Sequence, residues 1–527
     1  MYELIIRGGT VADGTGAPAF RADIAIENGK IAAIGKLPEA EAATVVDAAG
    51  KLVTPGFIDI HRHADAAVFR PGFGEAELRQ GLTTIVNGNC GLSTVPFGPA
   101  HRGEILHYLE PVVGKLGPEV PTGSFAEYFA ACKDLPLHAG MLAGSGSIRT
   151  DVCGYGLLHP GEEHIRAIRK ALETSLAEGA LGVSLGLGYA PECFYTTEEL
   201  ISALAPLKNG NAPVTVHMRQ EGDGVVESAL EMLSVAKALN CPMHISHLKA
   251  MGKRNHRSKI PEVLRLLDAA RAEGLRVDCD VYPYTAGSTQ LTIILPPEFL
   301  EGGPDALTER LKSKTEREKL KERIENGTDF DNIAQLAGWD GIYLTSLSLP
   351  ENLKYIGKNL AEIAEDLHTT PLDACCDLLV AEQCRITMID FMAAEEDIIS
   401  ILRHPLSNLI SDATYPTEGL PHPRVFGSFT RLIETYVLKE KALSVEEAVH
   451  KMTARPAEVL RLTGKGLLKP GMDADICVFR PEDLRENATY TDPCRPSSGM
   501  DKVLVGGKVA LDKDTLTGVK NGTAIKG

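Results

Sequence analysis

The sequence is poor in aromatic residues, in positive charge and in long apolar runs. Aromatic residues make up 5% of the 527 residues, with one tryptophan, so there is no platform for stacking bases. The formal net charge of −17 argues against nucleic acid or an anionic membrane as partner, although a local basic pair could still bind a small anion. No apolar run approaches the length of a bilayer span. With 44% hydrophobic and 24% charged residues, the composition is typical of a soluble globular protein.

A secretion signal and a disulfide framework are also missing. The first nine residues lack a basic segment followed by a long apolar one. The eleven cysteines are odd in number and form no repeated C-x-x-C pattern, and Cys375 and Cys376 are adjacent. This pattern favours reduced thiols over disulfides. We therefore expect a cytoplasmic protein.

Both ends of the chain carry short, alternating apolar runs that are typical of antiparallel strands. In the N-terminal part these runs are residues 4–6, 22–26 and 30–34, with glycine-containing turns at Gly8-Gly9 and at 27–30. The C-terminal runs are residues 473–479 and 503–509. The pattern predicts one small β-sandwich domain that is built from residues 1–53 and 461–527.

The middle of the chain, residues 54–460, repeats a strand followed by a helix. Helical periodicity is clear at 162–178 and 224–239. Alternation of this kind indicates an α/β fold with parallel strands, and eight strands predict a (β/α)₈, TIM-like barrel. The candidate strands are residues 56–60, 83–87, 138–144, 180–185, 214–217, 243–246, 276–281 and 408–411.

A long insertion separates the seventh and eighth predicted strands, at about residues 291–403. Its stretch 304–325 has mixed charges at helical spacing, which is typical of a solvated face rather than a binding tract. Insertions that follow a barrel strand lie over the C-terminal mouth, where active sites of this fold are found. We therefore expect the insertion to form a lid or a substrate-side subdomain.

Metal-binding residue types stand at the ends of these strands. His61 and His63 follow the first strand two residues apart, so both imidazoles can point to one ion while Arg62 faces away. Each such residue alone has an ordinary alternative, such as a buried thiol or a satisfied core histidine. Together, at one barrel mouth, they predict a metal centre of the zinc type. The other candidates are Cys90 after strand two, His217 ending strand five, His247 (rather than His244) ending strand six, and Asp412 ending strand eight.

These residues lie in motifs that resemble the N-acyl-D-amino-acid deacylase (D-aminoacylase) family of the amidohydrolase superfamily. The resemblance extends over nearly the whole chain. Many amidohydrolases bridge two metals with a carboxylated lysine from strand four, but residues 182–186 contain no lysine, so Cys90 is the discriminating mark. The sequence departs from the family pattern at Arg62 and Ala64. The matching motifs are residues 55–63, 88–91, 216–223, 245–249, 282–288, 411–412, 421–424 and 461–466.

The resemblance implies a role for each position. Cys90, His217 and His247 would hold a tightly bound zinc ion, and His61, His63 and Asp412 a second, weaker site. Asp412 would also act as general base and then acid in hydrolysis by metal-activated water. The substrate's carboxylate and scissile amide would contact Lys249, Tyr282 (or Tyr284), Ser288 and Arg424.

The predicted activity is zinc-dependent hydrolysis of N-acyl-D-amino acids, in which the preference for the D form is implied by the resemblance alone. Lys249 and Arg424 have an ordinary alternative as solvated cations. Arg219, Glu221 and Asp223 could stand behind the metal ligands, but a structural ion-pair network is the favoured interpretation. A cyclic-amide hydrolase of the hydantoinase or dihydroorotase kind is the rival activity. A non-catalytic relative that serves as an assembly or binding protein is the rival from another class.

Overall fold

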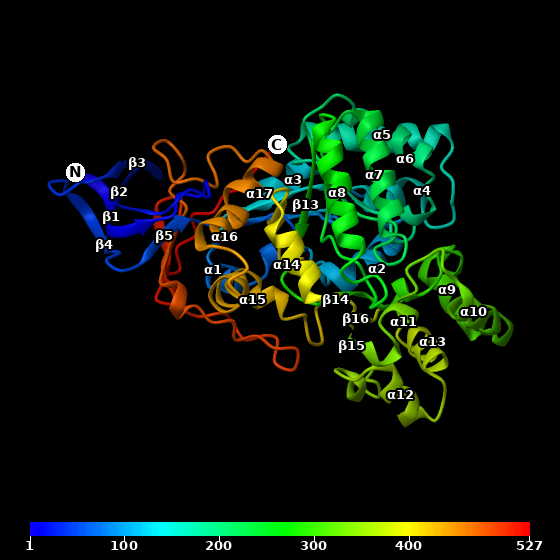
Figure 1. The fold of residues 1–527 in the computed structure, drawn as a ribbon. Coiled ribbons are helices and arrows are strands. Elements are labelled where there is room, and N and C mark those ends of the chain that lie inside the picture. Colours follow the sequence, from blue (N-terminus) through cyan, green and yellow to red (C-terminus); the bar gives the residue numbers. More distant parts are fainter.

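The computed structural model describes all 527 residues and brings the two ends of the chain into one nine-stranded sheet. β5 pairs antiparallel with β18, which joins the N-terminal and C-terminal strands; these lie side by side in Figure 1. A buried apolar cluster that includes Leu4, Ile24 and Ile476 fills this region. The strands are β1 (Tyr2–Val11), β2 (Phe20–Glu27), β3 (Lys30–Gly35), β4 (Ala42–Asp47), β5 (Leu52–Pro55), β18 (Ile476–Phe479), β19 (Met500–Val505), β20 (Lys508–Asp512) and β21 (Thr515–Leu516).

The two glycine-containing segments near the N-terminus behave differently. The turn predicted at Gly8-Gly9 is wrong, because β1 continues through both residues with a shift in register between Ile6 and Gly9. At this bulge β1 changes partner from β4 to β5, and a Cβ on Gly9 would lie 2.4 Å from Val53. The turn between β2 and β3 is present, with Asn28 and Gly29 both at positive φ, as tight hairpins require.

Eight segments of parallel strand form a closed ring. The pairing runs from β6 to β7 to β8, continues after one residue as β9, and then passes through β10, β11, β12 and β13 to β17. A parallel bridge between Arg62 and Ala413 closes the ring. The strands are β6 (Phe57–Asp59), β7 (Leu82–Asn87), β8 (His138–Met141), β9 (Ala143–Gly144), β10 (Val183–Gly186), β11 (Val214–His217), β12 (Met243–Ile245), β13 (Val277–Val281) and β17 (Ser407–Leu409).

Helices pack on the outside of the ring through their apolar faces. In α5 the buried positions Ile165, Ile168 and Leu172 recur at helical spacing, and they join a core cluster of 77 buried residues. None of the helices combines the length and apolar character that crossing a bilayer requires. The helices of this part are α1 (Glu75–Leu78), α2 (Arg102–Val113), α3 (Phe125–Ala131), α4 (Ser145–Cys153), α5 (Glu162–Ala177), α6 (Thr197–Ala203), α7 (Val225–Leu239), α8 (Lys259–Ala272), α14 (Glu395–Arg403), α15 (Arg424–Arg431), α16 (Val445–Met452) and α17 (Ala454–Val459).

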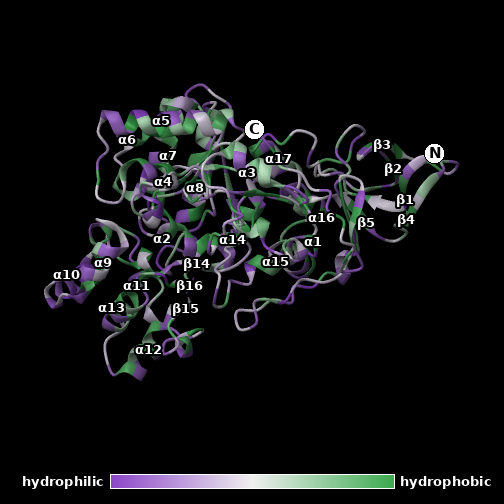
Figure 2. Ribbon diagram, turned by 180° about the vertical axis from the view of Figure 1, so that it is seen from behind, coloured by the Kyte–Doolittle hydropathy of each residue, from purple (hydrophilic) through white to green (hydrophobic).

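The segment between β13 and β17 forms a separate body with its own core of 27 buried residues, and it projects from the ring in Figure 1. α14, at its C-terminal end, packs instead on α8 and β17 of the ring. α10 is largely hydrophilic, as Figure 2 shows and as its mixed charges predicted. The elements are β14 (Ala286–Gln290), α9 (Gly303–Lys312), α10 (Lys314–Asn326), α11 (Ile333–Leu336), β15 (Ile342–Ser346), α12 (Leu360–Leu367), α13 (Pro371–Ala381) and β16 (Thr387–Phe391).

Candidate metal centre and active site

Three predicted ligands from three strands meet at the C-terminal end of the ring. Cys90 follows β7, His217 ends β11 and His247 follows β12. The Cys90 Sγ lies 3.4 Å from His247 Nε2, which in turn lies 3.0 Å from His217 Nδ1. All three are buried, and their donor atoms lie within 4.8 Å of one another. Sulfur and imidazole nitrogen at this spacing fit a zinc ion.

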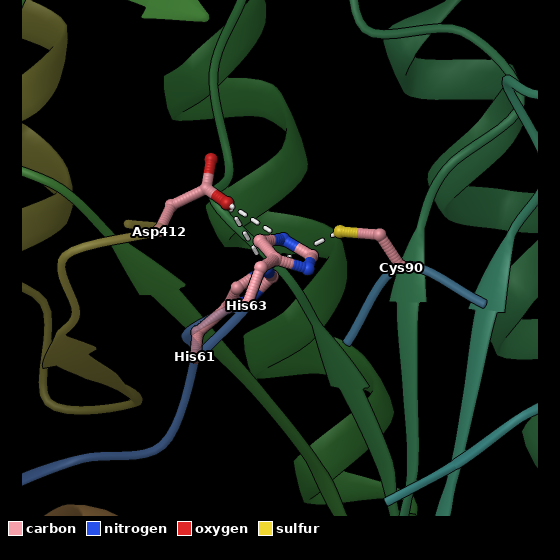
Figure 3. Close-up of side chains that lie close together, drawn as sticks. All are labelled: His61, His63, Cys90 and Asp412. Carbon is pink, nitrogen blue, oxygen red and sulfur yellow. Dashed lines mark hydrogen bonds and ion pairs between the residues drawn. The ribbon is translucent and has the colours of Figure 1, made fainter. Parts of the chain in front are cut away.

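A second group of donors shares Cys90 with the first. His61 Nε2 lies 3.2 Å from Cys90 Sγ, and His61 Nε2 and His63 Nε2 each lie 3.3 Å from Asp412 Oδ1. Figure 3 shows these four side chains turned toward a common centre. The sequence analysis assigned Cys90 to one site, whereas the structure places it between both groups.

The backbone is strained at three of these donors. Cys90, His247 and Asp412 have φ values of 53°, 38° and 53°, a left-handed region that non-glycine residues seldom adopt. Strain of this kind persists only where surrounding contacts fix the conformation, and it is typical of functional sites. At Asp412 these contacts are visible, because its N–H donates to the carbonyl of His61, and the N–H of His63 donates to the carbonyl of Ala413.

Neighbouring charges favour the ionised forms of the thiol and the carboxyl. Burial opposes ionisation of Cys90, but His61 and His247 outweigh it and hold the pKa of the thiol well below its usual value. Burial also opposes ionisation of Asp412, yet Arg424 and His61 hold the pKa of that carboxyl well below its usual range. Both shifts favour the anionic form, which suits a divalent cation.

Behind the first group, Glu221 supports both histidines. Its Oε1 lies 3.0 Å from His247 Nδ1, which also lies 2.9 Å from Lys249 Nζ. Its Oε2 lies 2.7 Å from Lys249 Nζ and 3.6 Å from His217 Nε2, the latter an ionic contact beyond hydrogen-bond distance. Glu221 therefore stands behind the ligands while it also pairs with Lys249, rather than belonging to a purely structural ion-pair network. The structural interpretation is right for its neighbours, since Arg219 pairs with Glu231 and Asp223 with Arg254.

The histidines of the second group have fewer polar contacts behind them. The Nδ1 atoms of His61 and His63 are buried and have no hydrogen-bond partner. The nearest carboxylate to His61 Nδ1 is Asp280, at 3.8 Å, and Asp280 is bound more closely by His244 Nε2 at 2.7 Å. His244 therefore serves Asp280 rather than the donor groups, in agreement with the choice of His247.

The predicted substrate-binding residues line one cavity of about 560 Å³ together with His63, Cys90, His217, His247 and Asp412. Arg424 NH1 lies 2.9 Å from Asp412 Oδ2, and its guanidinium stacks over the Tyr282 ring. Ser288 lines the cavity and accepts a hydrogen bond from Arg424 through its backbone carbonyl. Tyr284 donates to Glu486 and does not line the cavity, so the geometry favours Tyr282. Lys249 also lines it.

Arg62, the departure from the family pattern, points away from the donors as expected. It is fully buried and pairs with Asp59 at 3.1 Å and Glu77 at 2.7 Å. These contacts tie the end of β6 to α1 and so fix the loop that carries His61 and His63. A buried, fully paired arginine of this kind is a positioning element rather than a ligand.

Comparisons with known proteins agree with this geometry. The model of the amidohydrolase family matches residues 44–294 and 397–511. D-Aminoacylase of Alcaligenes xylosoxydans xylosoxydans is 32% identical over 99% of this chain and 97% of the relative. The chain belongs to the amidohydrolase family, in its D-aminoacylase branch. The N-acyl-D-glutamate deacylase of the same organism is 34% identical over 96% of this chain and 93% of the relative.

A solved structure is similar to this amidohydrolase over its full length. It is the N-acyl-D-glutamate deacylase of Bordetella bronchiseptica, complexed with zinc and a phosphonate that mimics the tetrahedral intermediate. It is 31% identical, with a TM-score of 0.85 and complete coverage of both chains. The family match omits residues 295–396, which is most of the separate body between β13 and β17. That body therefore lies outside the conserved amidohydrolase frame.

Among the cavity residues that were not predicted from the sequence, Tyr189, Asp331 and Asp390 stand out by their position or charge. Tyr189 packs on the His217 ring at 4.6 Å between centroids, while Asp331 and Asp390 come from the separate body. Asp280, behind the donors, was missed as well. Its signal was present, since a charged residue at an inward position of a predicted buried strand calls for a partner. No local pattern marks Tyr189, Asp331 or Asp390.

Proposed function

We propose that this amidohydrolase hydrolyses N-acyl-D-amino acids to a carboxylate and a free D-amino acid, with zinc as its metal. The strongest support is the buried donor set of one sulfur and two nitrogen atoms, which lies beside an ionised carboxylate and an arginine. The names of the relatives agree, since they include D-aminoacylase and N-acyl-D-glutamate deacylase.

In this proposal Cys90, His217 and His247 hold the tight zinc ion. His61, His63 and Asp412, next to the shared Cys90, form a weaker second site. When bound, zinc activates water and polarises the scissile carbonyl. The Nε2 atoms of His61 and His63, each 3.3 Å from Asp412 Oδ1, are the ring nitrogens that would bind a metal there.

Asp412 is the proposed general base and acid. It is ionised, it faces the cavity and it stands at the donors, so it can take a proton from the attacking water. It can then deliver that proton to the leaving amine, which is otherwise a poor leaving group. Arg424, at 2.9 Å, orients Asp412 and favours its ionised form before the proton is taken.

Arg424, Lys249, Tyr282 and Ser288 are the proposed contacts for the substrate's α-carboxylate and scissile amide. Arg424 offers a planar fork that matches a carboxylate, and Lys249 offers a compact charge. Both lie on the cavity wall, and each cation approaches the Tyr282 ring.

We assign the ring of eight strands within residues 54–460 to the (β/α)₈ barrel class. We assign the terminal strands, within residues 1–53 and 461–527, to a small β-sandwich whose two layers separate where β1 changes partner from β4 to β5. The insertion of about 291–403 is proposed as the lid, because Ile293, Ile333 and Asp390 line the cavity.

All eleven cysteines are unpaired, which supports the cytoplasm as the proposed location.

The rival cyclic-amide hydrolase is less well supported by the donors. β10, the fourth strand of the ring, has the sequence Val-Ser-Leu-Gly and offers no lysine to bridge two metals. A non-catalytic role fits poorly too, because the metal ligands and the carboxylate beside them are all present.

Zinc content and enantiomer preference together test the proposal. Protein purified without chelator should carry about one zinc ion and release amine from N-acetyl-D-methionine but not from N-acetyl-L-methionine. Absence of zinc, or faster turnover of hydantoin or dihydroorotate than of any acyl amino acid, would contradict the proposal. The lid is tested separately, since a saturating D-amino acid should slow proteolysis within residues 291–403.

A further inference from the structure

The cavity contains no cation that is free to bind a second carboxylate. Apart from the ligand histidines, its only cations are Lys249 and Arg424. Lys249 Nζ lies 2.7 Å from Glu221, and Arg424 lies 2.9 Å from Asp412. Both are therefore neutralised before any substrate enters, and the substrate's α-carboxylate must share them. The relatives include an N-acyl-D-glutamate deacylase, which is named for an acidic substrate, as well as a D-aminoacylase. Sequence identities of 34% and 32% to these two do not show which kind of side chain this enzyme accepts.

The cavity also contains two further acidic groups from the separate body. Asp331 accepts backbone hydrogen bonds from Glu221 and Gly222, at 2.6 and 2.9 Å, which satisfies its carboxylate. Asp390 is 3% exposed, lines the cavity and accepts no hydrogen bond to its side chain from another residue. Asp390 is thus a buried acid whose partner is missing from the protein itself.

The position of Asp390 is fixed by strand pairing. It lies on β16 opposite Gly287 of β14, and a Cβ added at Gly287 would lie 2.8 Å from Asp390 Oδ1 and 3.5 Å from the Tyr282 hydroxyl. The carboxylate therefore stands close to the Tyr282 hydroxyl. Met251, Met392 and Ile333 provide apolar wall around it, suited to the stem of a side chain.

We propose that Asp390 is a specificity-determining residue, which makes this enzyme reject acidic side chains and accept neutral N-acyl-D-amino acids. The inference rests on the proposed function and deepens it. An acidic side chain would bring a second carboxylate beside Asp390 with no cation left to balance it, and like charges placed together in a buried site are strongly disfavoured. A side-chain amide, by contrast, can donate a hydrogen bond to Asp390.

The test compares N-acetyl-D-glutamine with N-acetyl-D-glutamate, which have nearly the same shape and differ in charge. Burial raises the pKa of Asp390 to about 6, so the assay is run at pH 8, where the carboxyl is ionised. We expect kcat/KM of the zinc-loaded wild-type enzyme to be about 100-fold higher for the glutamine substrate. Asp390→Asn should raise kcat/KM for the glutamate substrate about tenfold and leave the glutamine substrate within about threefold.

Asp340→Asn is the matched control, because it removes the same charge from an exposed position of the same body and should leave both values unchanged. Equal or faster turnover of the glutamate substrate by the wild type overturns the inference, even if the variant fails to fold. So does an unchanged ratio in a folded Asp390→Asn. Turnover of N-acetyl-D-methionine but of neither of these substrates overturns this inference alone. If the zinc-loaded enzyme turns over none of the three, the proposed function fails and this inference fails with it.

Discussion

The two donor groups share Cys90 but differ in what stands behind their ligands. In the first group, Glu221 lies 3.0 Å from His247 Nδ1 and 3.6 Å from His217 Nε2. In the second group, the Nδ1 atoms of His61 and His63 have no hydrogen-bond partner, and the carboxylate nearest to His61 Nδ1, Asp280, lies at 3.8 Å. The carboxylate of the second group, Asp412, is already paired with Arg424.

Ligand identity alone does not set the metal affinity of such a group. A carboxylate behind a ligand histidine fixes its ring and makes its free nitrogen a better donor. Glu221 does this for two ligands at once, whereas the second group must divide Asp412 between a metal and an arginine. We therefore expect strong binding at the first group and weak binding at the second.

The largest effect is expected from Cys90→Ala, because Cys90 belongs to both groups. The variant should lose the tightly held zinc, and turnover should fall below detection, since a three-ligand site reduced to two histidines holds zinc poorly. Zinc is measured per chain by elemental analysis after dialysis. Cys132→Ala, another buried cysteine far from both groups, should keep full zinc and activity. Full zinc retention in Cys90→Ala would show that Cys90 is not a ligand of the tightly held zinc ion.

Asp412→Asn should separate chemistry from metal binding. The change removes the proposed proton carrier, and the loss of such a group typically lowers the rate by about 10² to 10⁴-fold. Asparagine also tolerates the left-handed φ of 53° at this position, so the backbone need not move. Zinc at the first group should stay near wild type. A turnover number close to that of the wild type would show that another residue carries the proton.

Glu221→Gln tests the support behind the first group directly. Loss of the charge behind two ligands should weaken zinc affinity by roughly 10 to 100-fold, and enzyme saturated with zinc should recover most of its kcat. Affinity is measured by competition with a chelator. Glu231→Gln, which removes a glutamate that pairs with Arg219 outside the cavity, is the matched control. An unchanged zinc affinity in Glu221→Gln would show that Glu221 does not cause the difference in affinity between the two groups.

Much of the site follows from sequence because barrel strands deliver their last residues to one place. His61, Cys90, His217, His247 and Asp412 each follow or end a strand that could be recognised by its apolar run, so their meeting was predictable. The order of the eight strands was predictable for the same reason, since parallel strands with crossover helices close in sequence order.

Other features depend on contacts that no local pattern records. Gly8-Gly9 has the composition of a turn, but pairing of β1 with two successive partners converts it into a bulge. Glu221 lies in a cluster of charges, and only its orientation distinguishes it from Arg219 and Asp223, which form surface pairs. Asp390 reaches the cavity because β16 pairs with β14, two strands more than 90 residues apart in the chain. Such long-range pairing is fixed by tertiary packing.

His63→Asn is expected to have the smallest effect, and it tests the weak side of the comparison. His63 belongs to the second group alone, so zinc at the first group should be unchanged. Its Nε2 lies 3.3 Å from Asp412 Oδ1, and loss of one such contact to a charged group lowers kcat by roughly tenfold. The matched control is His138→Asn, a buried histidine that contacts Asp475 outside the cavity and should keep its kcat. If His63→Asn released the tight zinc ion, the assignment of strong and weak groups would have to be reversed, because the partnerless ring would then hold metal more firmly than the rings that Glu221 supports.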